Sequence, residues 1–365
     1  MAGVIPLFSS QIANQGVDLA AALQRVVDRN WYVLGTEVTA FEAEFAAYQG
    51  VSSCVSLANG TDALEIALRT LDIGPGKKVI LVANAGFYGS TAVHSVGAQP
   101  IYVDVDAATL TMAPTALQAA IARGADAIIV THLYGQMADI EHIVAIAAAA
   151  KVPLIEDCAQ SHGATRNGRR AGSFCDIACY SFYPTKNLGA IGDGGAITTN
   201  DAELDMKARR LRQYGWSSKY HVTEAGGRNS RLDELQAAVL REKLPMLDGW
   251  NAQRREIASR YNAAFAELPV QTPSSIGDDF VAHLYVMRVQ DRAEFISSMS
   301  TDGVATDIHY PVPDHWQSAY PEARGVTLPV TEAASGALVT LPCFPGLDSV
   351  SISRVIAAVR AHYNA

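Results

Sequence analysis

Cysteine, basic charge and long apolar runs are all scarce in this sequence. There are five cysteines, an odd number, and none of them belongs to a paired CxxC motif. This pattern argues against a disulfide framework and favours reduced, mostly buried thiols in a cytoplasmic protein. The longest apolar runs are only as long as a strand, and residues 1–15 lack a basic stretch followed by an apolar one. We therefore expect neither a membrane span nor a signal peptide.

Positive charge is outnumbered by negative charge. The formal net charge is −9 at pH 7, whereas neutralising the phosphates of a nucleic acid requires a basic face. The protein is therefore not expected to be a general nucleic-acid binder. A phosphorylated small substrate stays compatible with this charge, because it needs only a few local cations.

Apolar residues, in contrast, are plentiful enough for a large core. Hydrophobic residues make up 49% of the 365 residues and charged residues 18%, which predicts an ordered protein with two packed lobes. Short apolar segments alternate with helical stretches along much of the chain, as is typical of α/β proteins. The expected strands are residues 78–82, 99–105, 125–132, 152–157, 176–183 and 195–199.

Helices are expected between several of these strands and in the last third of the chain. Their predicted ranges are 62–71, 139–150, 232–240 and 351–362, with a long helix from Pro245 towards Tyr261. Beyond residue 269 the pattern changes to short strands and loops. We therefore place a boundary near Pro245, between a large domain of residues 1–245 and a small domain of residues 246–365.

Three polar segments carry candidate chemistry. Residues 59–62, Asn-Gly-Thr-Asp, stand before a helix, where free N–H groups can bind an anion, although an ordinary helix cap has the same composition. Asp157 ends an apolar strand, and ligands in open α/β sheets bind beyond such ends. Lys186 follows Ser181 in a Ser-x₄-Lys loop. Each feature alone is more often structural. Together they offer the phosphate cradle, carboxylate and amine that pyridoxal phosphate needs.

Further segments extend this pattern over nearly the whole chain. They are residues 31–35, 41–42, 59–64, 157–160, 181–189, 193–195 and 229–233. With these segments the sequence resembles the sugar aminotransferases of the DegT/DnrJ/EryC1/StrS group. The resemblance implies the aspartate-aminotransferase fold (fold type I): an α/β large domain with a mostly parallel central sheet flanked by helices, and a smaller C-terminal α/β domain.

The resemblance also implies roles for matching residues around the cofactor. Lys186 is expected to form the Schiff base and then to move protons, while Asp157 pairs with the pyridine nitrogen. Gln160 is expected to contact the phenolic oxygen of the cofactor. The remaining cofactor contacts that the resemblance implies are Gly60, Thr61 and Ser181 at the phosphate, Phe87 or Tyr88 against the ring, and Asn229 from the neighbouring subunit of a homodimer with shared active sites.

Residues 309–315 resemble a segment of the branch that aminates C-3 of nucleotide-linked 3-keto-6-deoxyhexoses, and residues 183–187 favour the same branch. A proline-rich surface turn is the alternative for the first segment. The branch implies that L-glutamate donates its amino group through the pyridoxamine form of the cofactor to a dTDP-linked keto sugar, leaving 2-oxoglutarate. The expected substrate contacts are Tyr183, Lys219, Arg228, His309, Tyr310 and His315, with His221 and Arg231 as further candidates for the diphosphate.

Other functions stay open at this point. Amination at C-4 is one of them. A related dehydratase branch has histidine where this sequence has Lys186, and a non-catalytic regulator would be expected to have lost Asp157, Gln160 or Lys186. No metal is expected.

Overall fold

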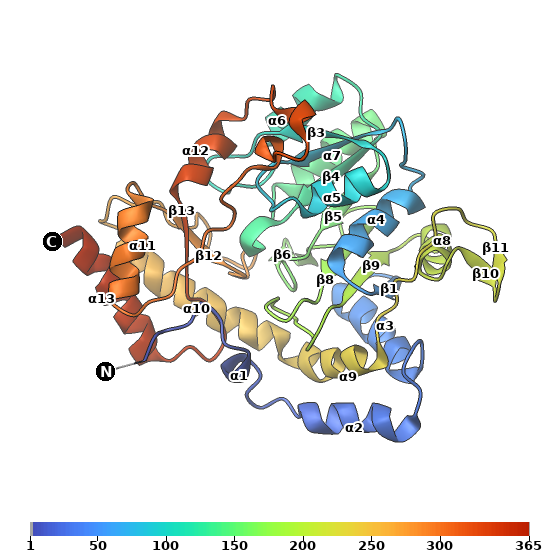
Figure 1. Ribbon diagram of the computed structural model, residues 1–365, viewed down its shortest axis with the longest axis horizontal. Helices are drawn as coiled ribbons and strands as arrows, with labels where there is room; N and C mark the ends of the chain where they lie inside the picture. The colour runs from blue at the N-terminus through green and yellow to red at the C-terminus, as the bar shows by residue number, and fades with distance from the viewer. Residues whose placement is uncertain (1–2, 365) are drawn as a thin grey trace.

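A seven-stranded sheet organises the first two thirds of the chain in the computed structural model, which describes residues 3–364 (Figure 1). The strand order is β1-β9-β8-β5-β4-β2-β3, and only β9 runs antiparallel to its neighbours. The strands are β1 (Ser53–Leu57), β2 (Lys78–Val82), β3 (Gln99–Val103), β4 (Ala127–Thr131), β5 (Leu154–Asp157), β8 (Ile177–Ser181) and β9 (Gly195–Thr199).

The predicted α/β class with a mostly parallel sheet is confirmed, and six of these strands were expected from the sequence. Strand β1 was missed because two serines interrupt its apolar pattern. Ser56 is nevertheless buried, and its N–H and hydroxyl both donate to the Glu42 carboxylate. A buried polar side chain of this kind is stable only because it has a hydrogen-bond partner.

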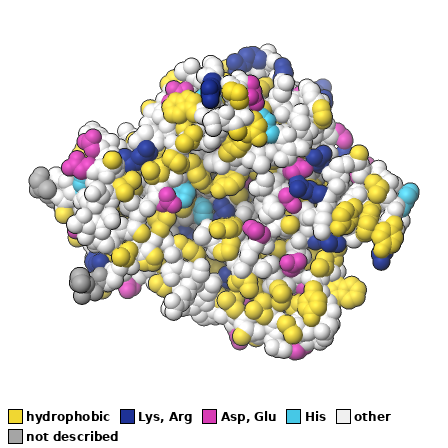
Figure 2. Space-filling view, in the orientation of Figure 1, with side chains coloured by type: hydrophobic (Ala, Val, Ile, Leu, Met, Phe, Trp, Pro, Cys, Tyr) yellow, Lys and Arg dark blue, Asp and Glu magenta, His cyan; other side chains and the backbone are white. Residues whose placement is uncertain are grey.

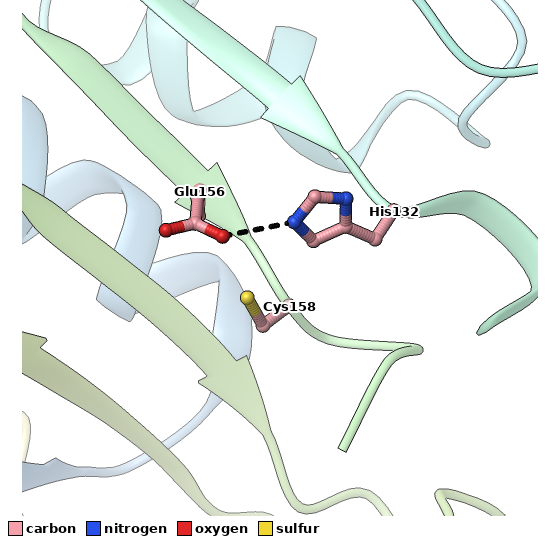
Figure 3. Close-up of side chains that lie close together, drawn as sticks. All are labelled: His132, Glu156 and Cys158. Carbon is pink, nitrogen blue, oxygen red and sulfur yellow. Dashed lines mark hydrogen bonds and ion pairs between the residues drawn. The ribbon is translucent and has the colours of Figure 1, made fainter. Parts of the chain in front are cut away.

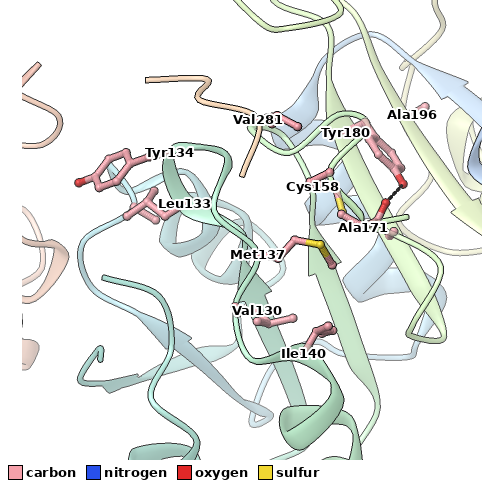
Figure 4. Close-up of a cluster of buried hydrophobic side chains, with 14 of the residues drawn as sticks. Val130, Leu133, Tyr134, Met137, Ile140, Cys158, Ala171, Tyr180, Ala196 and Val281 are labelled. Atoms are coloured by element: carbon pink, nitrogen blue, oxygen red, sulfur yellow. Dashed lines mark hydrogen bonds between the residues drawn. The ribbon is translucent and has the colours of Figure 1, made fainter. Parts of the chain in front are cut away.

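Helices cover both faces of the sheet, because alternate strand residues point to opposite sides. On one side Val79, Ile129 and Ile155 pack against α4, α5 and α8. On the other side Ile80, Ile128 and Val130 pack against α3, α6, α7 and α9, and Figure 4 shows part of this core around Val130 and Tyr180. The helices are α2 (Leu19–Arg29), α3 (Thr36–Gln49), α4 (Gly60–Thr70), α5 (Tyr88–Ser95), α6 (Pro114–Ile121), α7 (Ile140–Ala150), α8 (Ala202–Arg212) and α9 (Glu234–Lys243).

The rest of the chain forms a second core beside the first. Helix α10 (Leu247–Phe265) leads into it, and the antiparallel pair β12 (Tyr285–Arg288) and β13 (Leu338–Leu341) packs with α11 (Arg292–Thr301) and α13 (Ser349–Asn364). The N-terminal segment belongs to the same core, since Ile5 pairs with Val304. Helix α12 (Pro329–Ala337) and the loop before it lie towards the β3 end of the large sheet (Figure 1).

The domain boundary near Pro245 stays a prediction, and Leu244–Met246 forms a short 3₁₀ turn there between α9 and α10. Residues 1, 2 and 365, which the expected domains include, lie outside the described residues. Within residues 3–364, no helix combines the length and the apolar character needed to cross a bilayer.

Candidate active site

A cavity of about 660 Å³ lies where the two cores meet. Its wall combines the carboxyl ends of β4, β5 and β8, the first turn of α4, and residues of the C-terminal core such as His309 and Thr340. Figure 2 shows that this face of the molecule is hollowed near its centre, with histidine and basic side chains in the hollow. Ligands of parallel sheets bind at this position, beyond the carboxyl ends of the strands.

Asp157 is held at the end of β5 by its neighbours. Its carboxylate accepts the N–H of Ala159 at 3.1 Å and the hydroxyl of Thr131 at 3.2 Å. Thr131 reaches it because β4 and β5 pair with Thr131 opposite Asp157. Burial raises the pKa of Asp157, while these hydrogen bonds and the nearby Lys186 oppose the rise. A cationic ring nitrogen placed here would add a further charge that favours the carboxylate.

Lys186 faces the same cavity from the loop after β8. Burial lowers the pKa of its amine to about 8, against the opposing charge of Asp157. The loop is fixed by its next residue: the Asn187 amide donates to Asn251 Oδ1 at 2.8 Å and to the Val281 carbonyl at 3.0 Å. These contacts tie the lysine loop to α10 and to the segment that contains Val281. An amine with this lowered pKa has a substantial neutral, nucleophilic fraction near pH 8.

The start of α4 forms an anion cradle on the cavity wall. Asn59 caps the helix by accepting the Asp62 N–H at 2.8 Å, while the N–H groups of Gly60 and Thr61 make no hydrogen bond within the described residues. Glycine is required at position 60, because a Cβ there would lie 2.6 Å from the Ser181 Cβ. The free N–H groups at this helix N-terminus, together with the hydroxyls of Thr61 and Ser181 on the same cavity wall, can bind a phosphate.

Gln160 is oriented by hydrogen bonds on both ends of its amide. Its Oε1 accepts the Tyr134 N–H at 2.6 Å, and its Nε2 donates to the Tyr310 hydroxyl at 3.1 Å. Because Oε1 is occupied by a backbone donor, Nε2 must be the end that is available as a donor on the cavity side. A phenolic oxygen at this place would find a donor.

The structure distinguishes the two aromatic candidates for the cofactor ring. Tyr88 lines the cavity, whereas Phe87 does not. The backbone of Phe87 is left-handed (φ 69°), and its ring packs 5.0 Å from that of Tyr320 and 6.1 Å from that of His94. The side-chain direction therefore leaves Tyr88 as the aromatic that can face a ligand.

The expected substrate contacts divide in the same way. Tyr183, His309 and Tyr310 line the cavity. His315 does not: it is fully buried, and its Nε2 lies 3.2 Å from a carboxylate oxygen of Glu332. This histidine therefore holds its loop against α12.

The remaining predicted contacts lie away from the cavity of their own chain. Lys219 is exposed between β10 (Trp216–Ser218) and β11 (His221–Val222), and Asn229 is exposed nearby. Arg228 forms ion pairs with Glu65 and Asp62, so its charge is already compensated within the chain. A role for Lys219 or Asn229 at an active site requires another subunit.

Several residues on the cavity wall were not singled out from the sequence. They include Thr131, His283 and Arg254. Thr131 could have been found, because it ends a predicted strand beside the one that ends in Asp157. His283 and Arg254 come from segments whose spatial position depends on how the two cores pack, and no local pattern marks them.

Behind the cavity, His132, Glu156 and Cys158 form a group with metal-ligand chemistry (Figure 3). The hydrogen bonds show why it is structural. His132 Nδ1 accepts the Ala138 N–H, so Nε2 carries the proton and donates to Glu156 at 3.0 Å. Glu156 also accepts backbone N–H groups at 2.8 Å from Gly172 and Phe174. A metal ion would have to displace these bonds, and the arrangement instead fixes the strand ends under Asp157.

The cavity residues thus fit pyridoxal phosphate on their own chemistry: a phosphate cradle at Gly60 that has no room for a side chain, a buried carboxylate at Asp157 and an amine of lowered pKa at Lys186. Comparison with known proteins agrees. A dTDP-3-amino-3,6-dideoxy-alpha-D-galactopyranose transaminase of Aneurinibacillus thermoaerophilus is 44% identical, over 94% of this chain and 95% of its own.

Two further relatives match this chain over a similar length. A UDP-2-acetamido-2-deoxy-3-oxo-D-glucuronate aminotransferase of Pseudomonas aeruginosa is 41% identical, over 93% of this chain and 94% of its own. The crystal structure of S. venezuelae DesV in complex with a ketimine intermediate superposes with a TM-score of 0.96 at 40% identity, covering 100% of both chains. The model of the DegT/DnrJ/EryC1/StrS aminotransferase family matches residues 14–360. The chain therefore belongs to this family and is a pyridoxal-phosphate-dependent aminotransferase.

Proposed function

We propose that the protein transfers the amino group of L-glutamate to C-3 of a nucleotide-linked 3-keto-6-deoxyhexose, with dTDP as the nucleotide, in deoxyamino-sugar biosynthesis. The observation that carries the proposal is the composition of this cavity: cofactor-type residues at the strand ends lie opposite His309 and Tyr310. The segment around these two residues is the one that resembles the C-3 branch.

A relative named for a dTDP sugar and a relative named for a UDP sugar both support amination at C-3. The Aneurinibacillus enzyme is named for a 3-amino sugar and the Pseudomonas enzyme for a 3-oxo sugar. One carries dTDP in its name and the other UDP, at nearly equal identity to this chain. The C-3 assignment therefore has broader support than the dTDP assignment.

Pyridoxal phosphate, when bound, supplies an aldehyde that can bond an amine and a ring that can hold electron density. The residues of the chain supply the rest. Asp157 would keep the ring nitrogen protonated, and the first turn of α4 with Ser181 would hold the phosphate. The Lys186 amine would anchor the cofactor and would also be the base that takes the α-proton of the amino donor.

The sugar side of the cavity is provided by Tyr183, His309 and Tyr310. His309 is fixed by the hydrogen bond between its Nδ1 and the Thr340 hydroxyl at 2.8 Å. Burial lowers the pKa of His309, so its ring is neutral at pH 7 and can exchange hydrogen bonds with sugar hydroxyls in either direction.

We further propose a homodimer with shared active sites. Its support is the β10–β11 hairpin, which projects from the body of the chain (Figures 1 and 2). Tyr220 is 77% and Val222 58% exposed. Lys219 lies in the same hairpin, and Asn229 pairs with Gln213 just before it. Exposed apolar groups of this kind mark an interaction surface.

We also propose a cytoplasmic location. The cysteines of the described residues form no disulfide, which supports this location.

The test of the substrate is product analysis. The enzyme is incubated with L-glutamate and, separately, with 3-keto and 4-keto sugars linked to dTDP or to UDP, and the new amine is located by NMR. We expect amination at C-3 of the dTDP-linked 6-deoxy sugar. Amination only at C-4, or only of UDP-linked sugars, would require the corresponding part of the proposal to be replaced.

A further inference from the structure

Arg254 is a buried cation that has no anionic partner among the described residues. It lies on α10, is 2% exposed and lines the cavity. Its Nη1 donates to three backbone carbonyls, those of Ala282 at 3.3 Å, His283 at 3.2 Å and Cys343 at 2.6 Å. Carbonyls carry only partial charge, and within residues 3–364 no aspartate or glutamate forms a salt bridge with Arg254. The positive charge is therefore left uncompensated.

The opposite edge of the guanidinium is unused. Nε is buried and has no hydrogen-bond partner, and Nη2 makes no hydrogen bond within the described residues. A guanidinium has five N–H donors, and Nη1 accounts for two, so three donors lack a partner. Although burial lowers the pKa of Arg254 to about 10, the group stays charged at pH 7. A bound anion would compensate a buried charge of this kind.

Of the unused donors, Nε is enclosed by protein atoms, so Nη2 is the one that can meet a ligand in the cavity. The two N–H groups of Nη2 can form charge-assisted hydrogen bonds with a carboxylate. The location fits a molecule whose amine must reach Lys186. His283 also lines the cavity and connects the two cations. Its carbonyl accepts Nη1 of Arg254 at 3.2 Å, and its Nδ1 lies 3.0 Å from Oδ1 of Asn187, the residue that follows Lys186.

We propose that Arg254 binds a carboxylate of the amino donor through its Nη2 group. The inference rests on the proposed use of L-glutamate. A nucleotide diphosphate is the less suitable anion, because Arg254 is almost completely enclosed while a nucleotide needs the open side of the cavity. The donor is a small dicarboxylate that can enter this deep part.

The experiment separates the two half-reactions of the cofactor-loaded enzyme. Single-turnover absorbance with L-glutamate reports the donor half, and the same measurement with aminated nucleotide sugar reports the sugar half in reverse. Arg254→Lys keeps the positive charge but loses the guanidinium N–H groups, and Arg254→Gln loses both the charge and these groups. Arg255→Gln is the matched control, since Arg255 is the next residue and pairs with Asp278 at 3.5 Å.

We expect the half-saturating concentration of L-glutamate to rise about tenfold in Arg254→Lys and about a hundredfold in Arg254→Gln, as for a lost charge-assisted hydrogen bond. The sugar half should change less than about twofold, and Arg255→Gln should change neither. Calorimetric titration with 2-oxoglutarate should show the same loss. Unchanged glutamate dependence, loss confined to the sugar half, or equal loss in both halves would each overturn the proposal.

Two donor analogues identify which carboxylate is bound. L-glutamine retains only the α-carboxylate, and 4-aminobutyrate retains only the distal one. A penalty from Arg254→Lys that persists with L-glutamine assigns the α-carboxylate, and one that persists with 4-aminobutyrate assigns the side chain. Because the donor half needs no sugar, this result stands apart from the sugar assignment: failure of every keto sugar would refute the proposed acceptor and not the arginine. Arg254→Lys also serves if Arg254→Gln does not fold.

Discussion

Gly60 and Ser181 lie so close together that a methyl group on Gly60 would overlap the serine, with 2.6 Å between the two Cβ atoms. The first residue of α4 and the last residue of β8 thereby approach from different parts of the sequence. Their contact shapes the anion cradle, because it aligns the free N–H groups of α4 with the Ser181 hydroxyl.

Gly60→Ala should therefore weaken cofactor binding and destabilise the protein. Overpacking of this kind costs about 1–3 kcal/mol, since either α4 or the Ser181 loop must move. Gly249→Ala is the control, because nothing lies within 4 Å of a Cβ at that helical position. Calorimetric melting and the dissociation constant for pyridoxal phosphate check the prediction. Equal behaviour of the two variants would show that the close contact does not matter.

The lowered pKa of Lys186 predicts how cofactor capture depends on pH. Only a neutral amine attacks an aldehyde, and the pKa is about 8. The capture rate of cofactor-free protein should rise about tenfold per unit below pH 8 and level off above it. Stopped-flow absorbance measures the rate, and Lys186→Ala should show no such signal and no transamination. A rate that keeps rising to pH 10 would mean an ordinary lysine.

Asp157→Asn should leave the cofactor bound but slow transfer by roughly a hundredfold or more. An amide cannot balance a ring cation, and an ion pair at about 4 Å in an effective dielectric near 20 is worth up to about 4 kcal/mol. Cofactor occupancy by absorbance and single-turnover rates with L-glutamate separate the two effects. Near-normal rates at full occupancy would remove this role from Asp157.

Asp314 predicts a second pH effect, on stability. Its carboxylate accepts the Phe87 N–H at 3.0 Å and the Ser90 hydroxyl at 2.5 Å, and burial raises its pKa to about 7. The folded state thus holds a proton that the unfolded state has lost between about pH 4 and pH 7. The contribution of this group to stability should fall as the pH rises through that window. Denaturant unfolding should show a flatter profile for Asp314→Asn, and an unaltered profile would contradict the assignment.

The proposed shared site predicts complementation between two inactive proteins. Asn229→Ala and Lys186→Ala homodimers should each be severely impaired. A mixed dimer has one cavity in which both residues are intact, so activity should return on mixing. Native mass spectrometry verifies that subunits have exchanged. If exchanged dimers recover nothing, Asn229 does not contribute to a shared active site.

The sequence was most informative where function depends on strand ends. Asp157, Gln160 and Lys186 come together because β5 and β8 are parallel neighbours that end at the same edge of the sheet. The predicted α/β class already implies this arrangement of strand ends. Gly60 joins them because its helix follows β1. Strand β1, which is short and contains two serines, was not predicted. The anion cradle was still located correctly, because residues 59–62 were predicted to stand before a helix.

Side-chain direction in turns was less predictable. Phe87 and Tyr88 are adjacent aromatic residues, and only the left-handed backbone at Phe87 decides which of them faces the cavity. The buried position of His315 depends on Glu332, and the ion pairs of Arg228 depend on Glu65. These partners are distant in sequence, so no local pattern could have revealed them.

The pairing of Ile5 with Val304 has a consequence for the order in which the protein folds during its synthesis. The segment around Ile5 is synthesised long before the segment around Val304, so it cannot take its place in the fold until that later segment has been made. Leu7 and Phe8, which line the cavity, wait with it. We therefore expect the large sheet, whose strands lie between residues 53 and 199, to form during translation before the cavity is complete.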